Sequence, residues 1–98
     1  MIKQVEILGY KYEVDFIEDD RIIIVNNQEC LGACNPTEQK IQIRNDQHKQ
    51  QKKECYYHEI LHAIDWIMNG EHTLKEEQID FLARGLATVK FIKENKGA

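Results

Sequence analysis

The first half of the chain shows the two-residue alternation of apolar and polar positions that is typical of half-buried strands. The alternation is cleanest from Tyr10 to Ile17, where aromatic and aliphatic residues alternate with charged ones. A less regular alternation runs from Ile2 to Leu8, and Gly9 separates the two segments. Together the two segments predict a β-hairpin.

Three further segments extend the expected sheet region. The β-branched run from Ile22 to Val25 favours a strand. The alternation from Lys40 to Arg44 predicts another strand, and the stretch from Gln28 to Asn35 fits an extended segment less clearly. Turns are expected at residues 18–21 and at the Asn-Pro sequence of residues 35–38.

In the second half of the chain the apolar positions recur every three or four residues, which is the spacing of a helix with one packed face. A first helix is expected from about Asp46 to Asn69. Asn45 or Asp46 would cap its start, because a short side-chain acceptor can satisfy the free N–H groups there. Gly70 would end it in the left-handed conformation.

A second apolar stripe predicts a second helix. Thr73 is a suitable cap for it, with Glu76 three residues later as a capping-box partner. The last residues, 95–98, are expected to fray. The stripe consists of Leu74, Ile79, Leu82, Leu86 and Val89.

This order of elements predicts an α+β fold, with a small N-terminal sheet of about three to four strands packed against two C-terminal helices. With 98 residues, the chain is expected to form one domain, residues 1–98. A net charge of -4 argues against binding to nucleic acid or to an anionic membrane. The chain has neither a membrane-spanning apolar run nor a signal-peptide pattern, so we expect a cytoplasmic protein.

The first predicted helix carries the motif His58-Glu59-Ile60-Leu61-His62, which is H-E-x-x-H. Residues four apart lie on one face of a helix, so His58 and His62 can direct two imidazole nitrogens at one zinc ion. Glu59 emerges about 100° further around the helix. There its carboxylate can take a proton from a water held by the metal, which is the role of a general base in peptide hydrolysis.

Catalytic zinc usually has a third protein ligand. Glu76 and Asp80 lie four residues apart on the second helix, so Glu76 could bind the metal while Asp80 accepts the free N–H of a histidine ligand. Asp65, one turn past His62, is better placed to orient that imidazole. The other downstream candidates are Glu71, His72 and Glu77.

Two alternatives for Glu76 stay open at this point. If Glu76 caps its own helix through Thr73, it cannot also bind zinc. Glu77 points about 100° away from Glu76 and is the second candidate for the third ligand.

The H-E-x-x-H motif, followed by Glu76-Glu77-Gln78-Ile79-Asp80-Phe81-Leu82-Ala83, resembles the gluzincin group of zinc metallopeptidases. Within that group, the chain is most similar to the small ImmA/IrrE-type and prophage-encoded proteins, over roughly residues 30 to 90. The resemblance implies a minimal zincin-like metallopeptidase domain that uses Zn²⁺. It also implies His58, His62 and Glu76 as metal ligands, Glu59 as the base, and a phage or host regulatory protein as substrate.

Two other functions are compatible with these residues. One is a zinc-binding regulatory or interaction protein that has a peptidase-like fold and no activity, in which the metal would be a structural staple. The other is a metal-free binding module.

Under the peptidase hypothesis, Tyr56, Tyr57 and His72 are candidates for stabilising the oxyanion. If the strand from Lys40 to Arg44 lies at a sheet edge, an extended peptide could add to it.

The three cysteines are an odd number, so they cannot all form disulfides. In a reducing compartment we expect free thiols at all three positions. Cys30 and Cys34 have the spacing of half a zinc site, but no second pair completes it. Cys55 lies one turn before His58 and could face the metal, although a buried free cysteine is the favoured interpretation for each.

Overall fold

The computed structural model describes residues 2–18, 21–90 and 92. Within these residues, six strands precede two helices: β1 Ile2–Ile7, β2 Tyr10–Ile17, β3 Ile23–Val25, β4 Gln28–Cys30, β5 Gly32–Asn35, β6 Lys40–Arg44, α1 Lys49–Asn69 and α2 Glu76–Thr88. The predicted α+β fold is confirmed. The expected turn at residues 18–21 lies partly outside the described residues, and the expected fraying at residues 95–98 lies wholly outside them.

The main sheet has four strands in the order β1-β2-β6-β5. β1 and β2 form the predicted antiparallel hairpin, and Leu8 and Gly9 turn it with φ angles of 50° and 86°. β6 runs parallel to β2 and antiparallel to β5. The strand from Lys40 to Arg44 is therefore an interior strand, and the hypothesis that it forms an edge is wrong. β5 is the edge strand on that side.

The ambiguous stretch from Gln28 to Asn35 forms two strands in two sheets. Its first part, β4, pairs with β3 in a separate two-stranded sheet, and its second part, β5, joins the main sheet. The chain changes direction at Leu31, between β4 and β5. This bend brings the start of β5 close to the first half of α1.

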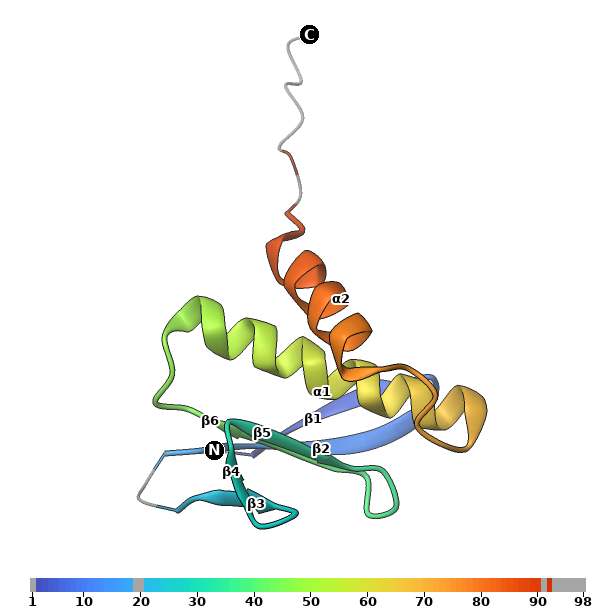
Figure 1. Cartoon of the computed structure of the whole chain (residues 1–98), viewed down its shortest axis with the longest axis horizontal. Coiled ribbons are helices and arrows are strands. Elements are labelled where there is room, and N and C mark those ends of the chain that lie inside the picture. Colours follow the sequence, from blue (N-terminus) through green and yellow to red (C-terminus); the bar gives the residue numbers. More distant parts are fainter. Residues whose placement is uncertain (1, 19–20, 91, 93–98) are drawn as a thin grey trace, which may run out of the picture.

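Figure 1 shows three layers: the four-stranded sheet, α1 across one of its faces, and α2 on the side of α1 that faces away from the sheet. The two central strands supply the buried side of the sheet through Tyr12, Val14, Ile41 and Ile43. They pack against Ala63 of α1, which is fully buried. No helix in the described part of the chain is both long and apolar enough to cross a membrane.

α1 begins three residues later than the sequence suggested, and the predicted cap is wrong. His48 occupies the N-cap position and makes no side-chain capping bond. Asp46 instead forms an ion pair with Arg44 at 2.9 Å, and the Asn45 side-chain oxygen accepts a hydrogen bond from Lys52 Nζ at 2.8 Å. The predicted end is confirmed, because Gly70 has a φ of 72° and donates to the carbonyl of Trp66.

α2 also begins later than predicted, at Glu76. Its N-cap residue is Lys75, whose backbone N–H donates to the side-chain oxygen of Gln78 at 2.8 Å. The capping box between Thr73 and Glu76 is therefore wrong, since Thr73 bonds instead to the carboxylate of Asp65. The Glu76 side chain is consequently not engaged in capping its own helix.

Candidate metal centre

Three side chains from the two helices meet at one point. The Nε2 atoms of His58 and His62 lie 3.1 Å apart. The two carboxylate oxygens of Glu76 face them, one at 3.0 Å from His58 Nε2 and the other at 2.9 Å from His62 Nε2. The fold thus brings together the three residues that the sequence nominated, and we call them the HHE group.

The spacing within the HHE group fits a zinc ion. Ligand atoms about 2.0–2.1 Å from a tetrahedral zinc lie about 3.3 Å from one another. With one ligand atom taken from each of the three residues, the atoms of the HHE group all lie within 4.8 Å of one another. Two imidazole nitrogens and one carboxylate oxygen are also the ligand set of a common class of catalytic zinc sites. A cation between these atoms would remove the repulsion among their lone pairs.

The other ring nitrogen of His58 supports the same assignment. Its Nδ1 lies 2.9 Å from Oδ1 of Asp80, on the second turn of α2. A carboxylate can only accept, so Nδ1 donates to Asp80, and in a neutral ring Nε2 is then the nitrogen that offers a lone pair to a metal. Asp80 therefore stands where the sequence argument expected it, one turn beyond Glu76.

His62 has a different environment. Burial lowers the pKa of His62 below its usual value, although the nearby Glu76 carboxylate acts in the opposite direction. The neutral imidazole that burial favours is the form that binds a metal. Its Nδ1 atom is buried and has no hydrogen-bond partner among the described residues.

Asp65 does not orient His62, and that prediction is wrong. Its carboxylate accepts hydrogen bonds from the side chain of Asn69 and from Thr73 and Leu74 in the loop between the helices. Burial by itself raises the pKa of Asp65, but these donors outweigh burial and hold the pKa below its usual value. Asp65 is therefore an ionised group that binds the interhelical loop.

Glu59 follows His58 on α1 and is 7% exposed. Burial, with the charge of Glu76 as a smaller cause, raises the pKa of Glu59 to about 8. Its carboxylate lies against the first residue of β5, because a Cβ built on Gly32 would come within 3.1 Å of Glu59 Oε2 and 2.6 Å of Cys55 Sγ. A side chain at position 32 would displace one of these groups, so the close approach requires glycine.

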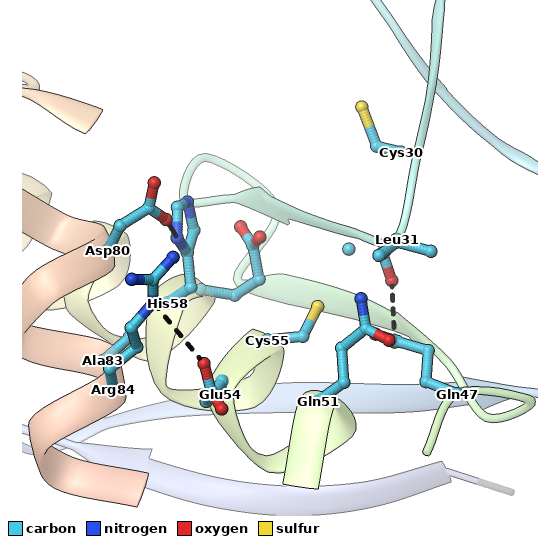
Figure 2. A pocket seen from close by; sticks show the side chains of 12 residues that line it. Cys30, Leu31, Gln47, Gln51, Glu54, Cys55, His58, Asp80, Ala83 and Arg84 are labelled. Atoms are coloured by element: carbon cyan, nitrogen blue, oxygen red, sulfur yellow. Dashed lines mark hydrogen bonds and ion pairs between the residues drawn. The ribbon is translucent and has the colours of Figure 1, made fainter. Parts of the chain in front are cut away.

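A cavity of about 410 Å³ opens beside Glu59 and His58. Figure 2 shows Leu31, Gln47 and Gln51 on one side of it, with His58, Asp80 and Arg84 on the other. Its volume is within the range of small-molecule and peptide side-chain sites, about 300–1,000 Å³. The proposed base therefore borders a space that a substrate could enter.

The three candidates for stabilising an oxyanion are in different places. The His72 ring centroid lies 5.3 Å from that of His62 and 5.1 Å from that of Trp66, beside the HHE group. Tyr56 packs against the hydrophobic core between the sheet and α1. The Tyr57 ring lies edge-on to the Tyr56 ring, with 5.4 Å between the two ring centroids. Of the three, His72 is the one that lies next to the proposed metal ligands.

All three cysteines are free thiols of intermediate burial. Burial and, to a smaller extent, the charge of Glu59 raise the pKa of Cys34 to about 12 and that of Cys55 to about 11. Both thiols are therefore protonated at neutral pH and are poor metal ligands in that form. Among the described residues, the one group of three or more candidate ligands is the HHE group.

The sequence argument missed Gly32 and the loop-binding role of Asp65. An isolated glycine inside an extended segment is a known sign of close backbone approach, so Gly32 could have been noticed. The partners of Asp65 come from beyond the end of its helix, and spacing within a helix does not indicate them. No protein-family model matches the chain, and no curated protein or solved structure matches it either.

Proposed function

We propose that this protein is a zinc-dependent peptidase that hydrolyses a protein or peptide substrate. His58, His62 and Glu76 are the proposed metal ligands, and Glu59 is the proposed general base. The observation that carries the proposal is the HHE group itself, in which the two Nε2 atoms lie 3.1 Å apart and each lies 2.9–3.0 Å from a different oxygen of Glu76. The buried carboxyl of Glu59 beside a cavity adds the group that catalysis needs.

A zinc ion held by the HHE group would supply a Lewis acid that polarises a peptide carbonyl and acidifies water. Glu59 then accepts the proton of the attacking water and delivers it to the leaving amine. If the HHE group held a zinc ion, its positive charge would favour the ionised form of Glu59, which a base requires, over the protonated form that burial favours. Asp80 holds the His58 ring in the tautomer that binds metal.

The free edge of β5 is the proposed path of the substrate backbone. Within the described residues, β5 pairs with β6 on one side and has no strand on the other. Its first residue, Gly32, lies against Glu59. An extended peptide that paired with this edge would pass beside the base and the cavity, so β5 takes the role that the sequence argument gave to Lys40–Arg44.

His72 is the proposed donor to the carbonyl oxygen. Its ring centroid lies 5.3 Å from that of His62, one of the proposed metal ligands. An imidazole N–H in such a position can stabilise the negative charge that develops on the carbonyl oxygen. This role of His72 is a proposal. The relation to gluzincin and ImmA/IrrE-type proteins is also a proposal, as is a phage or host regulatory protein as substrate.

One observation also favours a second function, that of a zinc-binding regulatory or interaction protein without activity. The proposed ligands come from both helices, and α2 makes its helix contacts with α1 through residues of one face, Ile79, Ala83 and Ala87. A bound ion would therefore join the two helices, which is how metals stabilise small domains.

Metal analysis and a cleavage assay test these functions in turn. Protein purified without an affinity tag should contain one zinc ion per chain, and His58→Ala with His62→Ala should remove it. The zinc-loaded protein is then incubated with a peptide library, and products are identified by mass spectrometry for the parent and for Glu59→Gln. Cleavage by the parent alone supports the peptidase. Full metal content without cleavage supports the regulator, and absence of zinc binding contradicts both.

A further inference from the structure

The most heavily hydrogen-bonded carboxylate among the described residues belongs to Asp65, which is 3% exposed. Its Oδ2 accepts from the backbone N–H groups of Thr73 at 2.7 Å and Leu74 at 2.9 Å. Its Oδ1 accepts from the Thr73 hydroxyl at 2.5 Å and from the side-chain amide of Asn69 at 2.8 Å. Hydrogen bonds to an ionised acceptor are stronger than neutral ones, so this arrangement is rigid.

These bonds connect two parts of the HHE group. Asp65 is on α1, less than one turn after His62, which supplies one proposed ligand. Thr73 and Leu74 come just before the first residue of α2, Glu76, which supplies another. The loop that joins α1 to α2 begins at Gly70, so the backbone hydrogen bonds of the two helices do not determine its path. The Asp65 carboxylate accepts three hydrogen bonds from this loop, next to the ring contacts of His72 with His62 and Trp66.

Apart from the contacts of Glu76 and Asp80 with the two histidines, the contacts between the helices offer little resistance to sliding and rotation. α2 buries Ile79, Ala83 and Ala87 on its inner face. The two alanine side chains are short, so they interlock little with the facing helix. The ion pair between Arg84 and Glu54 is 3.7 Å long and lies at the surface, where such pairs contribute little. A shift of α2 by one residue would turn Glu76 by about 100°, away from the histidines.

We infer that Asp65 is a positioning residue, whose carboxylate holds the interhelical loop so that Glu76 meets His58 and His62. The inference rests on the metal centre of the proposed function and extends it to a residue outside the HHE group. The Asp65 carboxylate is not part of the HHE group. It acts on metal affinity through the position of Glu76.

A thermodynamic cycle in the full chain tests this role. The dissociation constant for Zn²⁺ is measured by competition with a chelator for the parent, Asp65→Asn, Glu76→Gln and the double variant. Asparagine keeps the shape of the side chain but replaces one acceptor oxygen with an NH₂ group. We expect Asp65→Asn to weaken Zn²⁺ binding by about 10-fold, as losses of supporting groups do. In the Glu76→Gln background, Asp65→Asn should cause no further loss, because the two residues act as one unit.

A matched control separates positioning from general destabilisation. Val14→Ala removes buried volume from β2, in the sheet layer, where Val14 is 2% exposed. It should lower the melting temperature but leave Zn²⁺ affinity unchanged at temperatures where the protein is folded. Substitution of Co²⁺ for Zn²⁺ gives a second readout, since Asp65→Asn should alter the visible absorption bands in the same way as Glu76→Gln.

If Asp65→Asn does not fold, two milder variants give the same test. Thr73→Val removes one donor to Asp65, whereas Thr73→Ser retains it, so only the first should weaken Zn²⁺ binding. Additive losses in the cycle, or an unchanged dissociation constant in Asp65→Asn or Thr73→Val, would overturn the positioning role and leave the metal centre standing. A parent that binds no Zn²⁺ would overturn the metal centre and the positioning role together.

Discussion

The Nδ1 atom of His58 lies 2.9 Å from Oδ1 of Asp80, so a side chain of α2 fixes a ring on α1. The contact has a chemical consequence beyond joining the two helices. It directs the N–H of a neutral ring to Nδ1, so that Nε2, which faces Glu76 and His62, is the nitrogen that could bind a metal. The same helix supplies Glu76 one turn earlier, so α2 contributes both a proposed ligand and the group that orients another proposed ligand.

Replacing Asp80 should therefore weaken metal binding without removing a ligand. We expect Asp80→Ala to raise the dissociation constant for Zn²⁺ by about 10-fold, which is the lower end of the range for groups that support a histidine ligand. Chelator competition at neutral pH measures it. Arg84→Ala is the matched control, one turn further along α2, and an equal loss in both variants would contradict the orienting role.

The identity of the third proposed metal ligand can be tested by replacing Glu76 and Glu77 separately. Glu76→Gln should weaken Zn²⁺ binding by about 10-fold or more, because it removes a charged ligand from the HHE group. Glu77→Gln removes the same charge from the next position, whose side chain is not part of that group, and should change binding little. The reverse pattern would show that Glu77 is the ligand.

Glu59→Gln should separate catalysis from metal binding. It keeps the shape of the side chain and all three ligands, so Zn²⁺ affinity and melting temperature at pH 7 should stay near those of the parent. Peptidase activity should fall by about 10²–10⁴-fold, the usual contribution of a positioned acid–base group. Activity that survives this change in a zinc-loaded protein would remove the proposed mechanism.

Gly32→Ala tests the close approach of β5 to α1. The new Cβ would lie 2.6 Å from Cys55 Sγ and 3.1 Å from Glu59 Oε2, so we expect a destabilisation of about 1–3 kcal/mol, the usual cost of overpacking. Activity should fall as Glu59 is displaced. Gly85→Ala is the control, because its Cβ would meet nothing within 4 Å, and it should stabilise α2 by about 0.5–1 kcal/mol. Urea unfolding of both variants measures the difference.

Asp65 should make the protein sensitive to acid. Its hydrogen bonds hold its pKa below the usual value of 3.8, so the unfolded chain binds the proton more readily than the folded one. The stabilisation is therefore fully present above that usual value and is lost as the pH falls through it toward the lowered pKa of the folded state. The difference in free energy of unfolding between the parent and Asp65→Asn should be largest at neutral pH and should shrink below about pH 4. A difference that does not change with pH would contradict this role of the charge.

Local patterns in the sequence predicted the elements of the fold well. Alternation predicted β1, β2 and β6, and the change to helical spacing predicted α1 and α2, because side-chain direction follows the period of the backbone. The start of each helix was predicted less well. The acceptors expected to cap the helices, at Asn45, Asp46 and Thr73, are bonded to groups that lie elsewhere in the chain or across the loop.

The sequence by itself determined that His58 and His62 share a helical face and that Glu59 stands beside them, since a fixed helical period dictates both. It could only nominate Glu76 and Asp80, because no local rule states how far apart or at what angle two helices pack. The tertiary structure decided that point, because α2 buries Ile79, Ala83 and Ala87 on one face and the Asp65 carboxylate binds the loop just before α2. It also decided that β5 and not β6 is the edge strand, since strand order depends on pairings between distant segments that no short pattern encodes.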